Sequence, residues 1–206
     1  MVRGHWRYAL AAVAGAAFLA GCGGSDNSST PAAAPEAGHA APVRELYEFD
    51  SIPVLVATSD VVAVATVVGV RDGAVVGDDE AGVRLTEVTV RLGEVLRGDP
   101  SARTLRVEVD DAIVASRAWL RAGERSLFFL QRKDDASFRP VNSQAIYHVA
   151  TPEGRLDAVG RDAFSQDVAA RSLAGLRSEV RAANEQIAAG TVKAQVPSLE
   201  RSRGSS

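Results

Sequence analysis

The apolar positions in the middle of the chain follow the patterns of β-strands. Residues 61–70 form an uncharged run rich in valine, which predicts a strand buried on both faces. In residues 83–96 and 105–110, apolar and polar side chains alternate, which predicts strands with one buried face and one face in solvent. Gly93 interrupts the first of these alternations and predicts a bulge or a bend, which lets a long strand curl around a barrel.

Shorter apolar runs predict further strands in the second half of the chain, at residues 126–130, 138–141, 145–149 and 155–159. Turn-forming residues separate the expected strands at 71–73, 77–82, 97–100 and 152–154. A short helical or irregular segment is expected over residues 45–57, where Pro53 suits a first helical turn. Residues 112–120 follow neither period and are expected to be irregular or to form one helical turn.

One amphipathic helix is expected over residues 163–189. Its apolar residues recur at helical spacing on one face: Val168, Leu173, Leu176, Val180, Ala183 and Ile187. Asp162 or Ser165 can cap the start, and Gly190 stands where a glycine favours the end. The apolar seam is short, so packing on the domain's own sheet is favoured over a coiled coil, which stays open as the alternative.

Two segments have little to bury. Residues 22–44 are rich in glycine, serine, proline and alanine, a composition that cannot offset the entropy lost on ordering, so a disordered linker is expected. A disordered tail is likewise expected over residues 191–206. His39, in the linker, has no second metal-binding residue at a useful spacing and is interpreted as incidental.

The beginning of the chain has the pattern of a secretory signal. Arg3 and Arg7 precede an apolar run over residues 8–20. That run has 13 residues, whereas an α-helix needs roughly 20 to cross a bilayer. A transmembrane helix is therefore disfavoured, and the ending does not fit the Ala-x-Ala site of an ordinary signal peptide.

The only cysteine of the chain ends this segment, in the sequence Leu19-Ala20-Gly21-Cys22. The tetrapeptide resembles the lipobox of bacterial lipoproteins. The resemblance implies a signal peptide over residues 1–21, cleavage before Cys22 and a diacylglycerol thioether on its sulfur. Two or three acyl chains, at about 0.8 kcal/mol per buried methylene, anchor a protein stably. We therefore expect a lipid-anchored protein on the extracytoplasmic face of the cell membrane.

Three segments of the body resemble a group of secreted bacterial proteins of unassigned function: residues 60–67, residues 90–98 with Glu94-Val95-Leu96-Arg97-Gly98, and residues 123–130 with Gly123-Glu124-Arg125-Ser126-Leu127-Phe128-Phe129-Leu130. In that group the corresponding strands belong to a five-stranded barrel similar to the OB-fold of netrin-like and metalloprotease-inhibitor domains. The resemblance covers about residues 55–150 and implies a mainly β, OB-like five-stranded barrel followed by the C-terminal α-helix. No functional residue carries over, because those inhibitors act through disulfide-pinned N-terminal residues with a free cysteine amine.

Composition narrows the function classes. Removing residues 1–21 leaves 206 − 21 = 185 residues and 23 − 2 = 21 basic side chains against 26 acidic ones, a net charge of about −5. This balance indicates no basic patch, so nucleic acid is not expected as a partner. With Cys22 lipidated, no thiol is left for a disulfide or a thiolate site.

The sequence offers few candidates for catalysis or metal binding. His148 is the one histidine of the domain and stands on an alternating strand, where a hydrogen-bonded strand residue is favoured over a general base. The acidic clusters Asp78-Asp79-Glu80, Asp110-Asp111 and Asp134-Asp135 lack the spacing of a calcium loop and are interpreted as solvated. Trp119, between Arg117 and Arg121, hints at a binding patch, although packing at the core or rim is favoured.

The expected organisation is a signal peptide (1–21), the lipidated Cys22 with its linker (22–44), an OB-like barrel (45–160), an amphipathic helix (161–190) and a tail (191–206). We expect no catalytic, cofactor-binding or metal-binding residue. The favoured function is a non-catalytic module that binds an envelope protein or ligand, and an inhibitor or regulator of a secreted enzyme is the alternative. A hydrolase with an unusual site ranks third, and a pocket holding His148 and two acids would favour it.

Overall fold

The computed structural model describes residues 47–76, 83–111, 120–158 and 162–197. They belong to a compact unit that extends from Val43 to Ser206 and is separate from Met1–Pro42. Cys22, the linker up to residue 44 and Trp119 therefore lie outside the described residues. No helix within the described ranges has the length and apolar character needed to cross a membrane.

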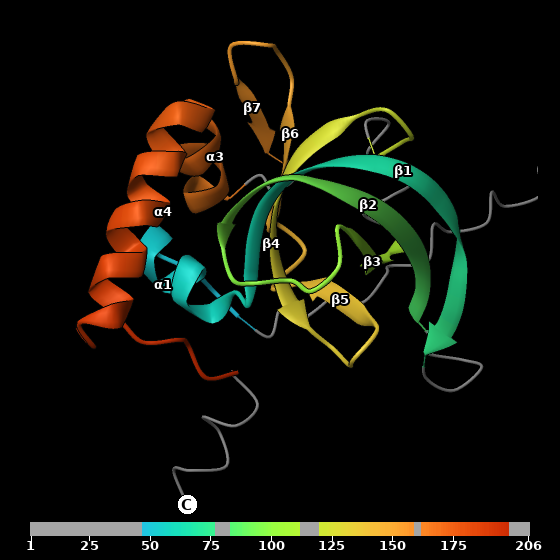
Figure 1. The fold of residues 1–206 in the computed structure, drawn as a ribbon, viewed down its shortest axis with the longest axis horizontal. Helices are drawn as coiled ribbons and strands as arrows, with labels where there is room; N and C mark the ends of the chain where they lie inside the picture. Colours follow the sequence, from blue (N-terminus) through green and yellow to red (C-terminus); the bar gives the residue numbers. More distant parts are fainter. Residues whose placement is uncertain (1–46, 77–82, 112–119, 159–161, 198–206) are drawn as a thin grey trace, which may run out of the picture. The chain divides into compact units, whose positions relative to one another are not determined.

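The protein is mainly β, and five of its strands close into a ring (Figure 1). The ring runs β1–β2–β3–β5–β4 and back to β1, formed by β1 (Val61–Val76), β2 (Val83–Arg97), β3 (Thr104–Asp110), β4 (Arg125–Arg132) and β5 (Ser137–Pro140). The β3–β5 pair is parallel, and the other pairs in the ring are antiparallel. The expected mainly β fold, with five strands closed on one another and a C-terminal helix, is thus confirmed. Two further strands, β6 (Ile146–Val149) and β7 (Leu156–Ala158), extend the sheet from β4.

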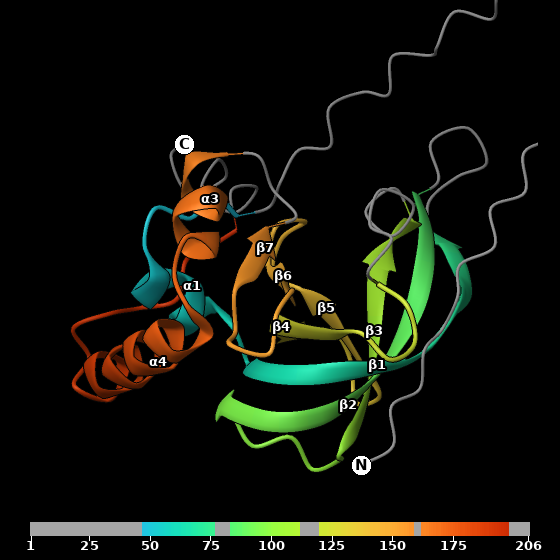
Figure 2. The same cartoon turned by 90° about the horizontal axis from the view of Figure 1, so that it is seen from above.

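Three described helices gather on one side of the barrel (Figures 1 and 2): α1 (Ile52–Thr58), α3 (Ala163–Ala169) and α4 (Leu173–Ala188). Two hydrophobic clusters result. One fills the barrel and contains Val107 and Phe128, and the other lies between the barrel wall and the helices and contains Val62 and Leu176. Because successive strand residues point to opposite faces, β1 supplies both clusters in turn.

Polar contacts fix α4 to the barrel. Arg177 on α4 forms a forked ion pair with Glu94 on β2, with donor–acceptor distances of 2.6–3.0 Å. The Asn184 side chain donates to the carbonyl oxygen of Leu96 at 3.0 Å and accepts from Arg97 at 2.9 Å. The helix packs on the domain itself, as the favoured interpretation of its apolar seam predicted.

The single helix expected over residues 163–189 is wrong, because the structure has two helices, α3 and α4. Ser172 is extended and caps α4, its Oγ accepting from the Gly175 amide at 3.0 Å. Ser172 also bridges to Arg155, and the Leu173 amide donates to the Gly154 carbonyl at 2.9 Å. At Ser172 and Leu173, backbone hydrogen bonds to the β6–β7 end of the sheet thus replace the hydrogen bonds of a continuous helix. The spacing of apolar residues does not reveal such a break.

The predicted ends of this segment agree with the structure. Asp162 caps α3 by accepting from the Ser165 amide at 2.9 Å, and Gly190 follows α4 with a φ of 72°. In the segment that follows α4, the Gln195 amide donates to the hydroxyl of Thr58 on α1 at 2.9 Å.

The turn expected at residues 71–73 is also wrong, because β1 continues through it to Val76. Arg71 lies opposite Glu87 and Asp72 lies opposite Thr86 in the β1–β2 ladder, so strand pairing overrides the local turn signal. A shift of register just beyond Asp72 accommodates Gly73. The bulge predicted at Gly93 is confirmed, since the register shifts at this residue between two consecutive pairs with β1.

Candidate functional site

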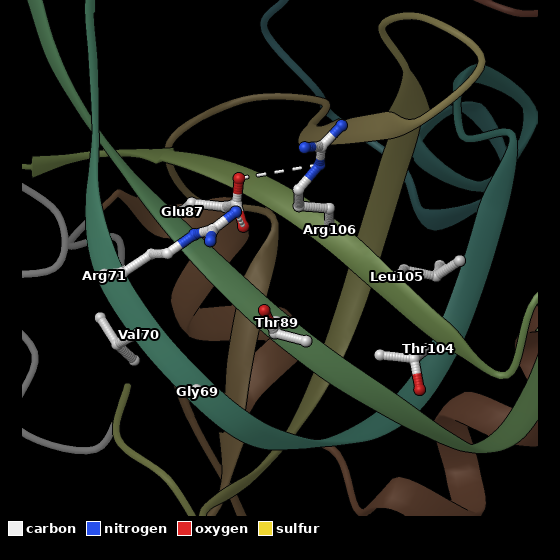
Figure 3. A pocket seen from close by; sticks show the side chains of 8 residues that line it. All are labelled: Gly69, Val70, Arg71, Glu87, Thr89, Thr104, Leu105 and Arg106. Atoms are coloured by element: carbon white, nitrogen blue, oxygen red, sulfur yellow. Dashed lines mark ion pairs between the residues drawn. The ribbon is translucent and has the colours of Figure 1, made fainter.

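A hollow of about 440 Å³ lies on the outer face of β1, β2 and β3 (Figure 3). Its lining residues come from these three strands: Gly69, Val70, Arg71, Glu87, Thr89, Thr104, Leu105 and Arg106. The volume falls within the range of about 300–1,000 Å³ that is typical of small-molecule sites. None of the lining residues is a histidine, cysteine, serine or lysine.

Strand alternation places the polar side chains of this hollow. Val88 and Val90 on β2 are buried in the barrel, so Thr89 between them points outward. Leu105 and Val107 on β3 are buried in the same way and leave Arg106 on the outer face. The sheet register then sets Thr89 directly opposite Arg106.

Gly69 forms the floor of the hollow. It lies opposite Thr89 in the β1–β2 ladder. A Cβ atom at Gly69 would meet nothing nearer than the Thr89 Cβ at 3.9 Å. The bare backbone here leaves room above the sheet, and the neighbouring threonines supply hydroxyl groups that donate and accept hydrogen bonds.

Two arginines share one glutamate at the rim of the hollow. Arg71 Nη2 lies 2.6 Å from Glu87 Oε1, and Arg106 Nε lies 3.7 Å from Glu87 Oε2. The second distance is too long for a hydrogen bond, so Arg106 is held only loosely by Glu87 (Figure 3). The side chains of Arg71 and Arg106 are 68% and 43% exposed. These guanidinium groups are therefore open to an anion from solvent.

The structure brings His148 between two carboxylates, away from the hollow. On β6, His148 Nε2 lies 3.2 Å from Glu124 Oε2, and Nδ1 lies 3.7 Å from Asp157 Oδ2 on β7. Its partner across β4 is Ser126, whose Oγ has no hydrogen-bond partner among the described residues. Ser126 is fully buried, so its hydroxyl is closed to a substrate. The arrangement agrees with the hydrogen-bonded strand residue predicted for His148.

The acidic clusters have different settings. Asp111 accepts from the Thr86 hydroxyl at 2.6 Å. Asp134 organises the β4–β5 turn, and hydrogen bonds from the Ser137 hydroxyl and the Ala136 amide lower the pKa of its carboxyl group. Residues 78–80 lie outside the described part of the chain. Within that part, no group of three or more histidine, cysteine or acidic side chains has an arrangement that could hold a metal ion.

Sequence reasoning did not single out the residues of the hollow. Alternation on β2 and β3 assigns Thr89 and Arg106 to a solvent face, which is a weak signal because most outward residues have no function. Only the register brings Gly69, Thr89 and Arg106 side by side. The pairing of β1 with β2 would have been needed to find the site.

The chain matches no known protein family, no curated protein and no solved structure. The OB-like assignment therefore rests on the order and direction of the strands in the closed ring. The functional argument rests on the residues themselves.

Proposed function

We propose that the protein is a lipid-anchored, non-catalytic binding module on the extracytoplasmic face of the cell membrane. Its binding site is the hollow on β1, β2 and β3, which lies on the face that OB-folds use for oligomeric ligands. The hollow carries the proposal, because it places exposed arginine and threonine side chains on a closed barrel. Cys22 supplies the membrane anchor.

The residues that line the hollow include no catalytic pair, which supports a binding function over a catalytic one. Arginine, glutamate and threonine line it, without a paired nucleophile and base. His148 and Ser126, the residues that a hydrolase would need, belong to a separate part of the sheet, where His148 is half-buried and the Ser126 hydroxyl is fully buried. A rigid barrel face suits recognition, since its side chains are already positioned before the ligand arrives.

Replacement of Cys22 tests the anchor. Lipidation requires the thiol, so Cys22→Ser should abolish incorporation of labelled fatty acid, and the wild-type protein should partition into detergent. The barrel should fold as before, because Cys22 lies outside the unit that begins at Val43. Equal labelling of mutant and wild type would refute the lipoprotein assignment.

A photo-crosslinking amino acid at position 89 tests the binding site. Incorporated into the full-length protein in its native envelope, it should capture an envelope component. The same group at Arg181, exposed on α4, serves as the control and should not capture this component. Capture of the same components from both positions would contradict a site on this barrel face.

An inhibitor or regulator of a secreted enzyme is the second candidate, supported by a different surface. The far ends of β1 and β2 expose valines at about half of their surface, with 53% for Val75, 52% for Val76 and 42% for Val83. Apolar side chains at a projecting strand end suit insertion into an enzyme's cleft. A crosslinker at Val76 that captures a secreted enzyme, with none captured from Thr89, would favour this function.

A further inference from the structure

We infer that the ligand of the hollow is an acidic glycan, a carbohydrate chain with carboxylate groups, and that Arg106 binds a carboxylate. This inference rests on the proposed function, since it assigns a ligand class to the same site. The observation that carries it is the setting of Arg106, whose side chain is 43% exposed and whose Nε lies 3.7 Å from Glu87, too far for a hydrogen bond (Figure 3).

The charges around the hollow favour an anion. Arg71, Arg106 and the exposed Arg91, which lies opposite Thr104, stand against Glu87 on this part of the face. The whole chain carries a net charge of −3, so this is a locally positive region on an acidic protein. The planar guanidinium of an exposed arginine matches the two oxygens of a carboxylate.

Glu108 does not cancel this charge. It lies opposite Glu87 on β3, but its carboxylate is 2.5 Å from Lys133 Nζ. Glu87 in turn is shared by two arginines. An incoming carboxylate therefore meets Arg106 beside acids that already have cationic partners.

The position of the hollow on the sheet face favours a glycan over a peptide. The backbone of β2 is paired with β1 on one side and with β3 on the other along the hollow. A peptide that adds to a sheet is held by free backbone groups at an edge, and those of β2 are already used. At the middle of the hollow, on β2, recognition therefore comes from side chains. The hydroxyls of Thr89, which lies opposite the bare Gly69, and of Thr104 suit the hydroxyl groups and flat face of a sugar ring.

Binding of a defined acidic sugar tests the inference. Isothermal titration of the full-length protein in detergent micelles compares trigalacturonic acid with its neutral methyl ester. The acid should bind and the ester should bind at least about tenfold more weakly, because the charge-assisted pair is lost. Arg106→Gln should weaken binding of the acid by about the same factor. Arg181→Gln on α4 makes the same charge change far from the site and should alter binding by less than about twofold.

The outcomes separate the inference from the proposed function. Equal binding of acid and ester, unaffected by Arg106→Gln, would overturn the acidic ligand but keep a glycan site. Failure of both sugars, with Arg106-dependent binding of triglutamate, would overturn the glycan in favour of an acidic peptide. If neither sugar nor triglutamate binds while position 89 still captures an envelope component, the inference fails and the binding function stands. If position 89 also captures no envelope component, both the acidic-glycan inference and the proposed binding function fail.

Discussion

The two halves of strand β1 lie in opposite environments. From Val61 to Val67 the strand pairs with β2 and β4, and its side chains alternate between the barrel interior and the layer beneath the helices. Beyond Gly69 it pairs with β2 within the described residues, and Val70, Val75 and Val76 are 41–53% exposed. We call these the helix-backed half and the hollow-bearing half. One continuous strand thus serves as core in one half and as surface in the other.

This contrast shows where the protein can tolerate change. In the helix-backed half all side chains except that of Thr66 are buried, so most substitutions there should affect folding. In the hollow-bearing half none of the side chains whose burial is described is buried, which leaves them available for recognition. The comparison can be tested at matched positions.

The largest expected contrast is between aspartate at Val62 and aspartate at Val76. Val62 is fully buried under the helices, so Val62→Asp should lower the free energy of unfolding by about 3 kcal/mol or more through an unpaired buried charge. Val76→Asp, at 52% exposure, should change it by less than about 0.5 kcal/mol. Urea denaturation of both variants measures the difference, and equal effects would contradict the division of β1.

Leu176→Ala tests whether the helices and the barrel fold as one unit. Leu176 is fully buried between α4 and the barrel wall, and its truncation should cost about 2–5 kcal/mol. Ser178→Ala on the exposed side of the same helix should cost less than about 0.5 kcal/mol. Loss of the helix signal before the strand signal in the Leu176→Ala variant would show that the two layers unfold separately.

A pair of glycines extends the comparison to the backbone. Gly98 has a φ of 81°, and a Cβ there would collide with the Asp60 carbonyl oxygen, so Gly98→Ala should cost about 2 kcal/mol or more. Gly69 has open space, so Gly69→Ala should stay within about 1 kcal/mol of the wild type and can stabilise through the unfolded state. Calorimetric melting compares the stability of the two variants. A larger loss of stability for Gly69→Ala than for Gly98→Ala would contradict the stricter backbone constraint at Gly98.

The smallest expected effect is a pH dependence at the β4–β5 turn. Hydrogen bonds from the Ser137 hydroxyl and the Ala136 amide lower the pKa of the Asp134 carboxyl group below its ordinary value. A lowered folded-state pKa stabilises the protein above the unfolded value, and this contribution is lost as the pH falls through the folded value. Asp134→Asn should therefore reduce the fall in stability below about pH 4. An unchanged slope in acid denaturation would exclude this contribution.

Much of the fold was predictable, because it follows from local patterns. Alternation on β2 and β3 reflects one buried face, and the glycine at position 93 marks its bulge. The break between α3 and α4 was not predictable, because the bonds at Ser172 and Leu173 come from residues 154 and 155. The extension of β1 beyond Arg71 likewise depends on pairing with a distant strand.

The candidate site was less accessible to sequence reasoning than the fold. The strand pattern predicted that His148 is a hydrogen-bonded strand residue, and the structure shows its contact with Glu124. The pattern could not identify Glu124 and Asp157 as its neighbours, because both come from other segments. The hollow could not be inferred from the sequence, because β1, β2 and β3 must pair in register before Gly69 and Arg106 lie on either side of Thr89. The side chains that meet on the face of a sheet depend on the register between strands, whereas the strands themselves can be predicted from the local sequence pattern.

The parallel seam between β3 and β5 has a consequence for the motions of the barrel. Its described register consists of the pairs Arg106–Ser137 and Val107–Phe138, whereas β1 and β4 pair from Val61 to Thr66. Short ladders open at lower free energy than long ones, and their amide protons exchange sooner with solvent. The ring would thus fluctuate open along one line, next to the arginine that we assign to the ligand. A molecule held at Arg106 would slow that exchange, so occupancy could be followed by the lifetime of a few amide protons at this seam.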